Sequence, residues 1–384
     1  MVSAPVILVV ALAGVGLGAL LGLLRRKNVD LIVRARLARR PERSDGTCHL
    51  FVSVADHFEP YWQRADGTRA LERVQAWHQE YPRRMEGIRD NGGRAPRHAF
   101  FYPEEEYDER CMDLLADLER RGLGVVEVHL HHDNDTSTAL HERLSAFKKV
   151  LHERHGLLRA DPDTGEVRYA FIHGNWTLDN SGPRGENCGV NDELRVLSRS
   201  GCYADFTYPS APHPTQPPMI NRIYYATDDP ERPRSHWRGE DARYGRAGRG
   251  DLLLFTGPLA LNWRRRRRGV LPAVENGDIT GRNPALPDRV DLWVRHAPAV
   301  RGFPRWRFLK PYTHGTQEGN SALLLSDGPG GLAAVYRDLL ARYNDGRRYV
   351  VHFTTPWEMY RCVRVLEDAD DEAIEAVEAF AFRF

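Results

Sequence analysis

The sequence predicts an α/β protein with a distorted (β/α) barrel of about seven or eight strands, preceded by one transmembrane helix. Short apolar segments alternate with amphipathic helical segments from residue 48 onward, which is typical of parallel strands joined by crossover helices. About seven or eight such units occur without a GxGxxG motif, which favours a barrel over a dinucleotide-binding sheet. A long apolar segment at the amino terminus predicts the helix that precedes the barrel.

The apolar segment covers residues 2–24 and carries no charge, and roughly 20 such residues span a bilayer core. Its cations follow it, whereas a cleaved signal peptide carries them before a shorter apolar stretch. We therefore expect a membrane anchor with a basic flank over residues 1–27, a juxtamembrane linker over 28–47, and a catalytic barrel over 48–384.

The charge distribution predicts an orientation for this anchor. Arginines and lysine cluster after the helix, beginning at Arg25, so the barrel is expected on the cytoplasmic face of the inner cell membrane. Gly14, Gly18 and Gly22 share one helix face, a pattern that allows two membrane helices to form a homodimer. Glycine is also simply common in membrane helices, so this dimer has an equally good alternative explanation.

The predicted elements alternate along the chain. We predict strands over residues 49–55, 98–102, 125–129, 168–173, 203–208, 251–256, 290–294, 308–312 and 348–353. We predict helices over residues 68–90, 105–121, 137–155 and 191–200, a helix that begins at Thr355-Pro356, and an acidic helix at the end of the chain. Glycines end the first three helices, and proline suits the first position of the later one.

Composition restricts the classes of function. Lys+Arg 54 against Asp+Glu 53 gives a net charge of +1, so no overall field selects nucleic acid, and we expect no nucleic-acid partner. Five cysteines without a CxxC motif favour free thiols over a disulfide framework. Residues 209–250 are rich in proline and arginine and lack periodicity, so we predict an elaborated loop there.

The most informative segment is residues 125–135, VVEVHLHHDND, where an apolar strand runs into histidines and carboxylates. Imidazole and carboxylate are ligands that suit zinc and similar divalent ions. Because strand ends converge in a barrel, residues at other strand ends are expected in the same pocket. The candidates from those other ends are Asp56, His57, Glu59, His173, Asn175, His314 and His352.

These motifs resemble the polysaccharide deacetylase superfamily, that is, carbohydrate esterase family four and its relatives. The family's first motif is an apolar strand that ends in Asp-Asp, and residues 52–57, VSVADH, match the strand and the first Asp. The second motif is His-Ser/Thr-x-x-His, and residues 131–135, HHDND, match its first histidine. His57 and Asp135 stand where the family has Asp and His, so a set of two histidines and one carboxylate is kept.

The resemblance implies a distorted (β/α) barrel that removes acetyl groups from a polysaccharide or other glycan, with zinc as the expected ion. It implies Asp56 as catalytic base and His57, His131 and Asp135 as metal ligands, with His129 and His132 as alternative ligands. The late histidine that protonates the leaving group is His314 or His352, of which we favour His314.

Two other functions stay open. A glycoside hydrolase on the same barrel would need two carboxylates roughly 5–10 Å apart, and the candidates are Asp56, Asp133, Asp135, Glu275 and the run 104–106, which also suits a solvated helix start. A catalytically inactive, membrane-anchored scaffold that binds glycan would explain the departures from both motifs. The arginine run 264–268 suits a solvated loop, anionic lipid or an acidic polysaccharide.

Overall fold

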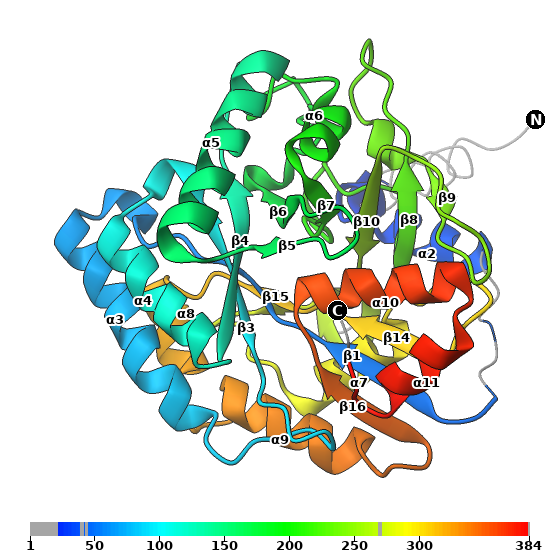
Figure 1. The fold of residues 1–384 in the computed structure, drawn as a ribbon. Coiled ribbons are helices and arrows are strands. Elements are labelled where there is room, and N and C mark those ends of the chain that lie inside the picture. Colours follow the sequence, from blue (N-terminus) through cyan, green and yellow to red (C-terminus); the bar gives the residue numbers. More distant parts are fainter. Residues whose placement is uncertain (1–21, 39–41, 43–44, 268–270, 383–384) are drawn as a thin grey trace, which may run out of the picture.

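An 11-stranded, mostly parallel sheet forms the centre of the protein (Figure 1). The computed structural model describes residues 22–38, 42, 45–267 and 271–382. The main strand order is β13 (Asp278–Ile279), β15 (Tyr312–Thr313), β2 (Ala55–His57), β3 (His98–Pro103), β4 (Gly124–Leu130), β6 (Val167–His173), β7 (Cys202–Asp205), β10 (Leu252–Thr256), β8 (Arg222–Ala226) and β9 (Glu240–Asp241). Strands from β13 to β10 pair in parallel, whereas β10, β8 and β9 pair antiparallel. The short strand β5 (Arg159–Ala160) pairs with β6.

A second, parallel sheet shares two chain segments with the large one. It consists of β14 (Trp306–Leu309), β1 (Cys48–Val52) and β16 (Tyr349–Phe353). β1 leads into β2 through Ser53 and Val54, and β14 leads into β15 through Lys310 and Pro311. Each segment therefore pairs first in the small sheet and then in the large one.

Helices pack around the sheets (Figure 1). They are α2 (Val29–Ala38), α3 (Gly67–Arg84), α4 (Glu109–Arg120), α5 (Ser137–His155), α6 (Glu193–Ser200), α7 (Pro287–His296), α8 (Glu318–Leu324), α9 (Leu332–Tyr343), α10 (Pro356–Asp368) and α11 (Asp371–Glu378), with short 3-10 turns η1 (Trp62–Arg64), η2 (Glu104–Glu106), η3 (Gly174–Trp176) and η4 (Ser235–Trp237). Asp66, Asp108 and Thr136 cap α3, α4 and α5 by accepting a hydrogen bond from a backbone N–H. α4 contacts both α3 and α5 on the outside of the sheet.

The strands separate two apolar cores because successive side chains point to opposite faces. In β3, Phe100 packs in the core beneath the helices, whereas Phe101 packs in the core on the inner face. On the inner face, Phe255 of β10 stacks on Phe206 with ring centroids 4.8 Å apart and meets Phe308 of β14 at 5.9 Å. The large sheet thus curls toward the small one around a shared aromatic core.

The predicted barrel is wrong, because the ladder of strands is open and mixed. Within the described residues, β13 and β9 lie at opposite ends of the large sheet and do not pair with each other. The difference arises in segment 209–250, for which the sequence predicts a loop but which contains β8 and β9. β8 runs antiparallel to β10, and β9 runs antiparallel to β8. Residues 290–294, predicted to be a strand, lie in α7, which Pro287 begins at its first turn.

The prediction of a transmembrane helix over residues 2–24 also requires correction. Residues 1–21 lie outside the part of the chain that the structure describes, and so do Gly14 and Gly18 of the predicted dimer face. Among the described residues, no helix is long and apolar enough to cross a membrane. α2 has 10 residues and carries charged side chains such as Asp30. For the described structure the prediction of a single-pass protein of the inner membrane is therefore wrong.

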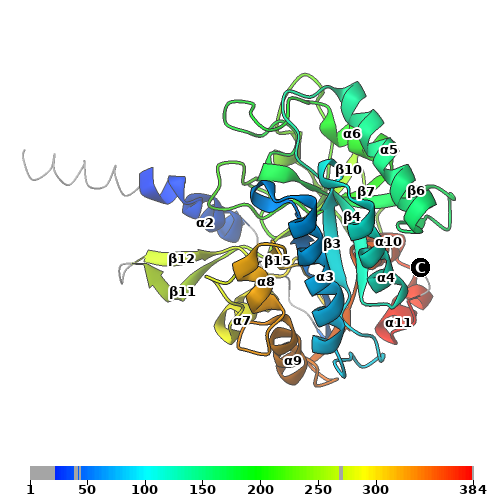
Figure 2. The ribbon, with the colours of Figure 1, turned by 90° about the vertical axis from the view of Figure 1, so that its left-hand side faces the viewer.

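A two-stranded hairpin and α2 project from the same side of the protein (Figure 2). The hairpin pairs β11 (Ala260–Arg267) with β12 (Leu271–Glu275), so residues 264–267 of the arginine run belong to a strand. Ile32 of α2 joins a small apolar cluster with Leu259 at the base of the hairpin, and Leu261 and Val274 pack against it.

A buried ion pair joins the hairpin to α7. Arg289 donates to both oxygens of Glu275 at 2.8 and 2.7 Å and to Asp278 Oδ1 at 2.9 Å. Trp293 Nε1 donates to Glu275 Oε1 at 2.7 Å. The carboxylate of Glu275 is thus fully engaged within the fold, and Arg289 is 0% exposed.

We expect Arg289→Leu to lower the free energy of unfolding by about 3–5 kcal/mol, because it leaves the Glu275 carboxylate buried without its cation. Urea unfolding followed by circular dichroism measures the change. Arg266→Leu, at an exposed position of the neighbouring hairpin, is the matched control and should change stability by less than about 0.5 kcal/mol. Equal stability of the two variants would show that the pair does not hold the hairpin.

Candidate metal sites

Two groups of metal-binding side chains lie beyond the carboxyl ends of the central parallel strands. The strand-end cluster consists of His57, Glu59, His129, His131 and His314, and the buried quartet consists of His132, His173, Cys188 and Glu193. The cluster contains two overlapping sets that share Glu59, and in each set, as in the quartet, the potential ligand atoms lie within 4.8 Å of one another. Both groups have the side chains to hold a metal ion.

In the strand-end cluster, backbone contacts fix which nitrogen of His129 is free. Its Nδ1 lies 2.7 Å from the Ile172 carbonyl oxygen, which can only accept a hydrogen bond. In the neutral ring Nδ1 therefore carries the proton and Nε2 the lone pair, whereas a protonated ring also donates a hydrogen bond from Nε2 to Glu59. Nε2 lies 3.3 Å from Oε1 of Glu59.

His131 is held in a similar way by a carboxylate. Its Nδ1 lies 2.6 Å from Oε1 of Glu105, and the same oxygen accepts from the His131 backbone N–H at 3.1 Å. Its Nε2 points to Glu59, 3.6 Å from the same Oε1 that His129 approaches. Two Nε2 atoms and one carboxylate oxygen therefore converge, each imidazole being oriented by a partner on its far nitrogen.

His57 and His314 complete the cluster, stacked with ring centroids 4.6 Å apart. Burial is the main cause that holds the pKa of His57 well below its ordinary value, and the nearby His314 and His129 lower it further. Burial also lowers the pKa of His314, although Glu59 and Asp56 oppose this. The lowered pKa values favour the neutral form of both rings, in which one ring nitrogen has a lone pair that can bind a cation.

The pKa values of Glu59 and His131 are shifted in opposite directions. Burial raises the pKa of Glu59, but the hydrogen bond with His129 and the charges of the histidines outweigh burial, so the pKa is lowered overall. Burial lowers the pKa of His131, but its hydrogen bond to Glu105 and the negative charge of Glu59 outweigh burial, so this pKa is raised overall. These surroundings favour the ionised carboxylate of Glu59, which attracts a positively charged partner.

Asp56, the predicted base, is fully buried and holds the segment that carries His314. Its Oδ2 lies 2.8 Å from Nε2 of His98, and its Oδ1 accepts from the Gly315 N–H at 2.6 Å. Trp77 Nε1 donates to the Gly315 carbonyl at 2.9 Å. The contacts of Asp56 therefore fix the position of the loop next to the cluster.

The structure places His57, His131 and His314 in the strand-end cluster and Asp135 outside it. Oδ2 of Asp135 lies 3.2 Å from Nδ1 of His132 and 3.6 Å from Nη1 of Arg143, so Asp135 borders the buried quartet. His352, the alternative to His314, has its Nε2 2.8 Å from His49 Nδ1 within the core and belongs to neither group. Glu59 is the carboxylate of the cluster in place of Asp135.

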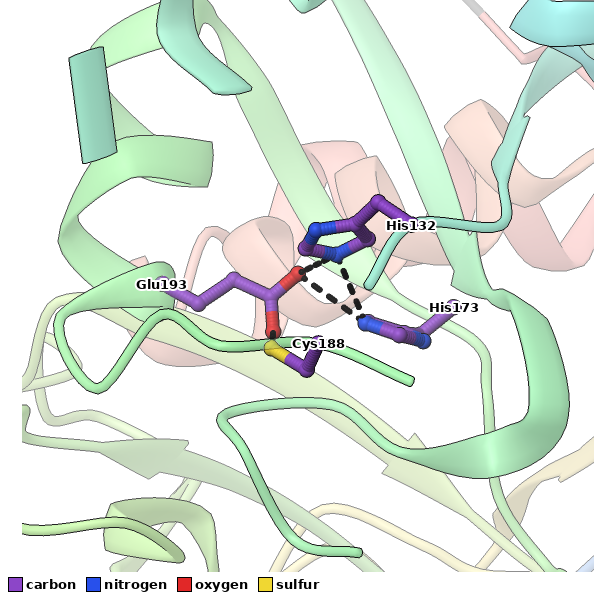
Figure 3. A group of neighbouring side chains, drawn as sticks. All are labelled: His132, His173, Cys188 and Glu193. Atoms are coloured by element: carbon purple, nitrogen blue, oxygen red, sulfur yellow. Dashed lines mark hydrogen bonds and ion pairs between the residues drawn. The ribbon is translucent and has the colours of Figure 1, made fainter. Parts of the chain in front are cut away.

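The buried quartet joins the ends of β4 and β6 to Cys188 and to Glu193, the first residue of α6 (Figure 3). The Nε2 atoms of His132 and His173 face each other at 2.8 Å, and Oε1 of Glu193 lies 3.1 and 3.4 Å from them. Cys188 Sγ lies 3.3 Å from the other oxygen of Glu193. Burial raises the pKa of Glu193, but His173 and His132 outweigh it and lower the value to about 2, so the group is a carboxylate.

Sequence reasoning did not single out Cys188 or Glu193. His173 and Glu193 follow His132 by 41 and 61 residues, so no short motif in the sequence indicates the set. The only sequence signal was that Cys188 and Glu193 both follow His173, a histidine at the end of a predicted strand. Glu105 lies in the run 104–106, which in the sequence also suits a solvated helix start, and in the structure it orients His131.

Comparison with known protein families and with curated proteins gives no match for this chain. The resemblance to polysaccharide deacetylases therefore depends on the motifs in the sequence, and any functional assignment depends on the geometry of the two groups.

The contact between Gly315 and Asp56 gives a testable prediction. A Cβ at Gly315 would lie 2.1 Å from Asp56 Oδ2 and 2.6 Å from the Trp77 ring, so Gly315→Ala must displace the loop that carries His314. We expect a loss of about 1–3 kcal/mol in the free energy of unfolding, measured with urea. Gly319→Ala is the matched control, because a Cβ there meets nothing within 4 Å. Unchanged stability of Gly315→Ala would contradict this packing.

Proposed function

We propose that this protein is a metal-dependent hydrolase that removes acetyl groups from a glycan. One observation carries the proposal: the Nε2 atoms of His129 and His131 converge on the carboxylate of Glu59 at 3.3 and 3.6 Å. Two histidines and one glutamate are a known ligand set of catalytic zinc, which keeps a further position open for water or substrate. The side chain of His131 is 32% exposed, so solvent reaches this set at His131.

The chain's own residues supply the other parts of such a site. A divalent ion held by Glu59, His129 and His131 would polarise the acetyl carbonyl and activate water. Glu105 orients His131 through its Nδ1. In this proposal His314, which stacks on His57, would accept a proton from water and return it to the leaving alcohol or amine. In this proposal Asp56 positions the His314 loop and is not the base.

A glycan suits the aromatic side chain beside these residues. The partly buried ring of Trp176 has its centroid 6.3 Å from His57 and 6.3 Å from His314. Aromatic rings commonly supply an apolar face with a polar edge at binding sites. The resemblance of residues 52–57 and 131–135 to the deacetylase motifs supports the same class of substrate.

The carboxylates do not favour the glycoside hydrolase alternative. Glu275 is bound by Arg289, and Glu104 is bound by Arg143 at 2.6 Å. Asp133 accepts from the Asn187 N–H at 2.7 Å. Glu275, Glu104 and Asp133 are therefore engaged within the fold and do not form a pair that flanks a glycosidic bond. We retain the glycoside hydrolase and the inactive glycan-binding scaffold as outcomes of the test.

The test uses the purified protein, loaded with zinc, and a panel of acetylated oligosaccharides, with released acetate as the readout. His131→Ala should abolish acetate release because it removes one of the three ligands. Glu105→Gln should reduce it by about 10–100-fold, since it removes only the group that orients His131. His78→Ala is the control, because His78 pairs with Asp117 on the outer helices.

Three results would contradict the proposal. Acetate release that survives His131→Ala would move the reaction away from the cluster. New reducing ends without acetate would indicate a glycoside hydrolase. Glycan binding without either product, in the zinc-loaded protein, would indicate a scaffold.

A further inference from the structure

The directions of the donor atoms in the buried quartet favour a cation at its centre. His173 Nδ1 lies 2.6 Å from the Gly174 carbonyl oxygen, so Nδ1 carries the proton and Nε2 has a lone pair. Nδ1 of His132 lies 3.2 Å from the Asp135 carboxylate without the alignment of a hydrogen bond, and the negative charge there favours a proton on Nδ1 in the neutral ring. Two lone pairs would then face each other across 2.8 Å, beside a carboxylate oxygen. Such an arrangement needs a shared proton or a metal ion between the donors.

The distances suit a small tetrahedral ion. Bonds of about 2.0–2.3 Å to nitrogen, oxygen and sulfur place the ligand atoms of tetrahedral zinc roughly 3.3–3.7 Å apart. The four contacts drawn in Figure 3 span 2.8–3.4 Å, with the histidines facing one Glu193 oxygen and Cys188 the other. All four potential ligand atoms lie within 4.8 Å of one another, so small side-chain shifts accommodate the ion. The soft thiolate of Cys188 with two imidazoles favours zinc over magnesium or calcium.

Backbone groups around Cys188 are arranged for a thiolate. Its sulfur lies 3.3 Å from the Asn180 backbone nitrogen and 3.5 Å from that of Val190, and both N–H groups donate to sulfur. Hydrogen bonds of this kind favour the charged form of an acceptor. With a divalent cation, one thiolate, one carboxylate and two neutral imidazoles, the site has no net charge, which greatly reduces the penalty for burial.

The quartet is closed, unlike the strand-end cluster. His173, Cys188 and Glu193 are each 0% exposed and His132 is 7% exposed, so no open position faces a substrate. A site with four protein ligands and no open position is characteristic of structural zinc. The quartet ties β4 and β6 to the segment from η3 to α6, and that segment carries Trp176, the ring beside His57 and His314.

We infer that His132, His173, Cys188 and Glu193 form a second, structural zinc site, which anchors the segment that walls the strand-end cluster. The inference does not depend on the proposed hydrolase activity. The competing arrangement is a buried hydrogen-bond network, in which a protonated His132 donates to Glu193 and Cys188 stays a thiol.

Cobalt in place of zinc distinguishes the two arrangements, because only the quartet includes a sulfur ligand. The wild-type protein loaded with Co²⁺ should show a thiolate-to-cobalt charge-transfer band, which Cys188→Ala should remove. Cys202→Ala is the matched control: Cys202 is also a buried free thiol but belongs to neither metal-binding group, so the band should persist.

Zinc content of the zinc-loaded protein gives the second readout. The double variant His129→Ala, His131→Ala should retain one zinc per chain, whether or not the strand-end cluster binds metal in the wild type. Failure of the proposed function would thus leave this result intact. A wild-type protein without a thiolate band, a band that survives Cys188→Ala, or a double variant without zinc would each overturn the inference. If Cys188→Ala does not fold, the spectrum of the wild type and the zinc content of the double variant still decide the question.

Discussion

The alternation of side chains at the end of β4 is the constraint on which both metal sites depend. Parallel pairing with β3 and β6 fixes the register of β4, and the chain then leaves the sheet beyond Leu130. His129 and His131, two residues apart, reach Glu59, whereas His132 turns to His173 and Glu193. One short segment therefore supplies histidines to two separate groups.

The two groups differ in access, and this difference separates their roles. The strand-end cluster has a partly exposed ligand in His131 and two neutral imidazoles beside it, which suits chemistry on a substrate. The buried quartet has no exposed donor, which suits a structural ion. Trp176 links them, because it lies on the segment held by the quartet and its ring borders His57 and His314. Loss of the buried quartet would thus change the position of Trp176 beside the strand-end cluster, without direct contact between the two groups.

Sequence reasoning predicted what local pattern determines and missed what the three-dimensional arrangement determines. The strand from 168 to 173 and the helix from 137 to 155 follow from periodicity and caps, and both are present as β6 and α5. Glu59 replaced Asp135 because the direction in which each side chain leaves its loop depends on tertiary contacts, not on spacing. Cys188 lies in a segment without periodicity, so only the fold brings it to His173. The barrel failed because antiparallel pairing of β8 is not visible in the sequence of segment 209–250.

Anomalous scattering at the zinc edge, from crystals of the zinc-loaded protein, tests the central claim most directly. We expect one peak bonded to Glu59, His129 and His131 and a second peak enclosed by the buried quartet. Zinc-loaded crystals with no peak at Glu59 would contradict a metal-dependent reaction at the strand-end cluster.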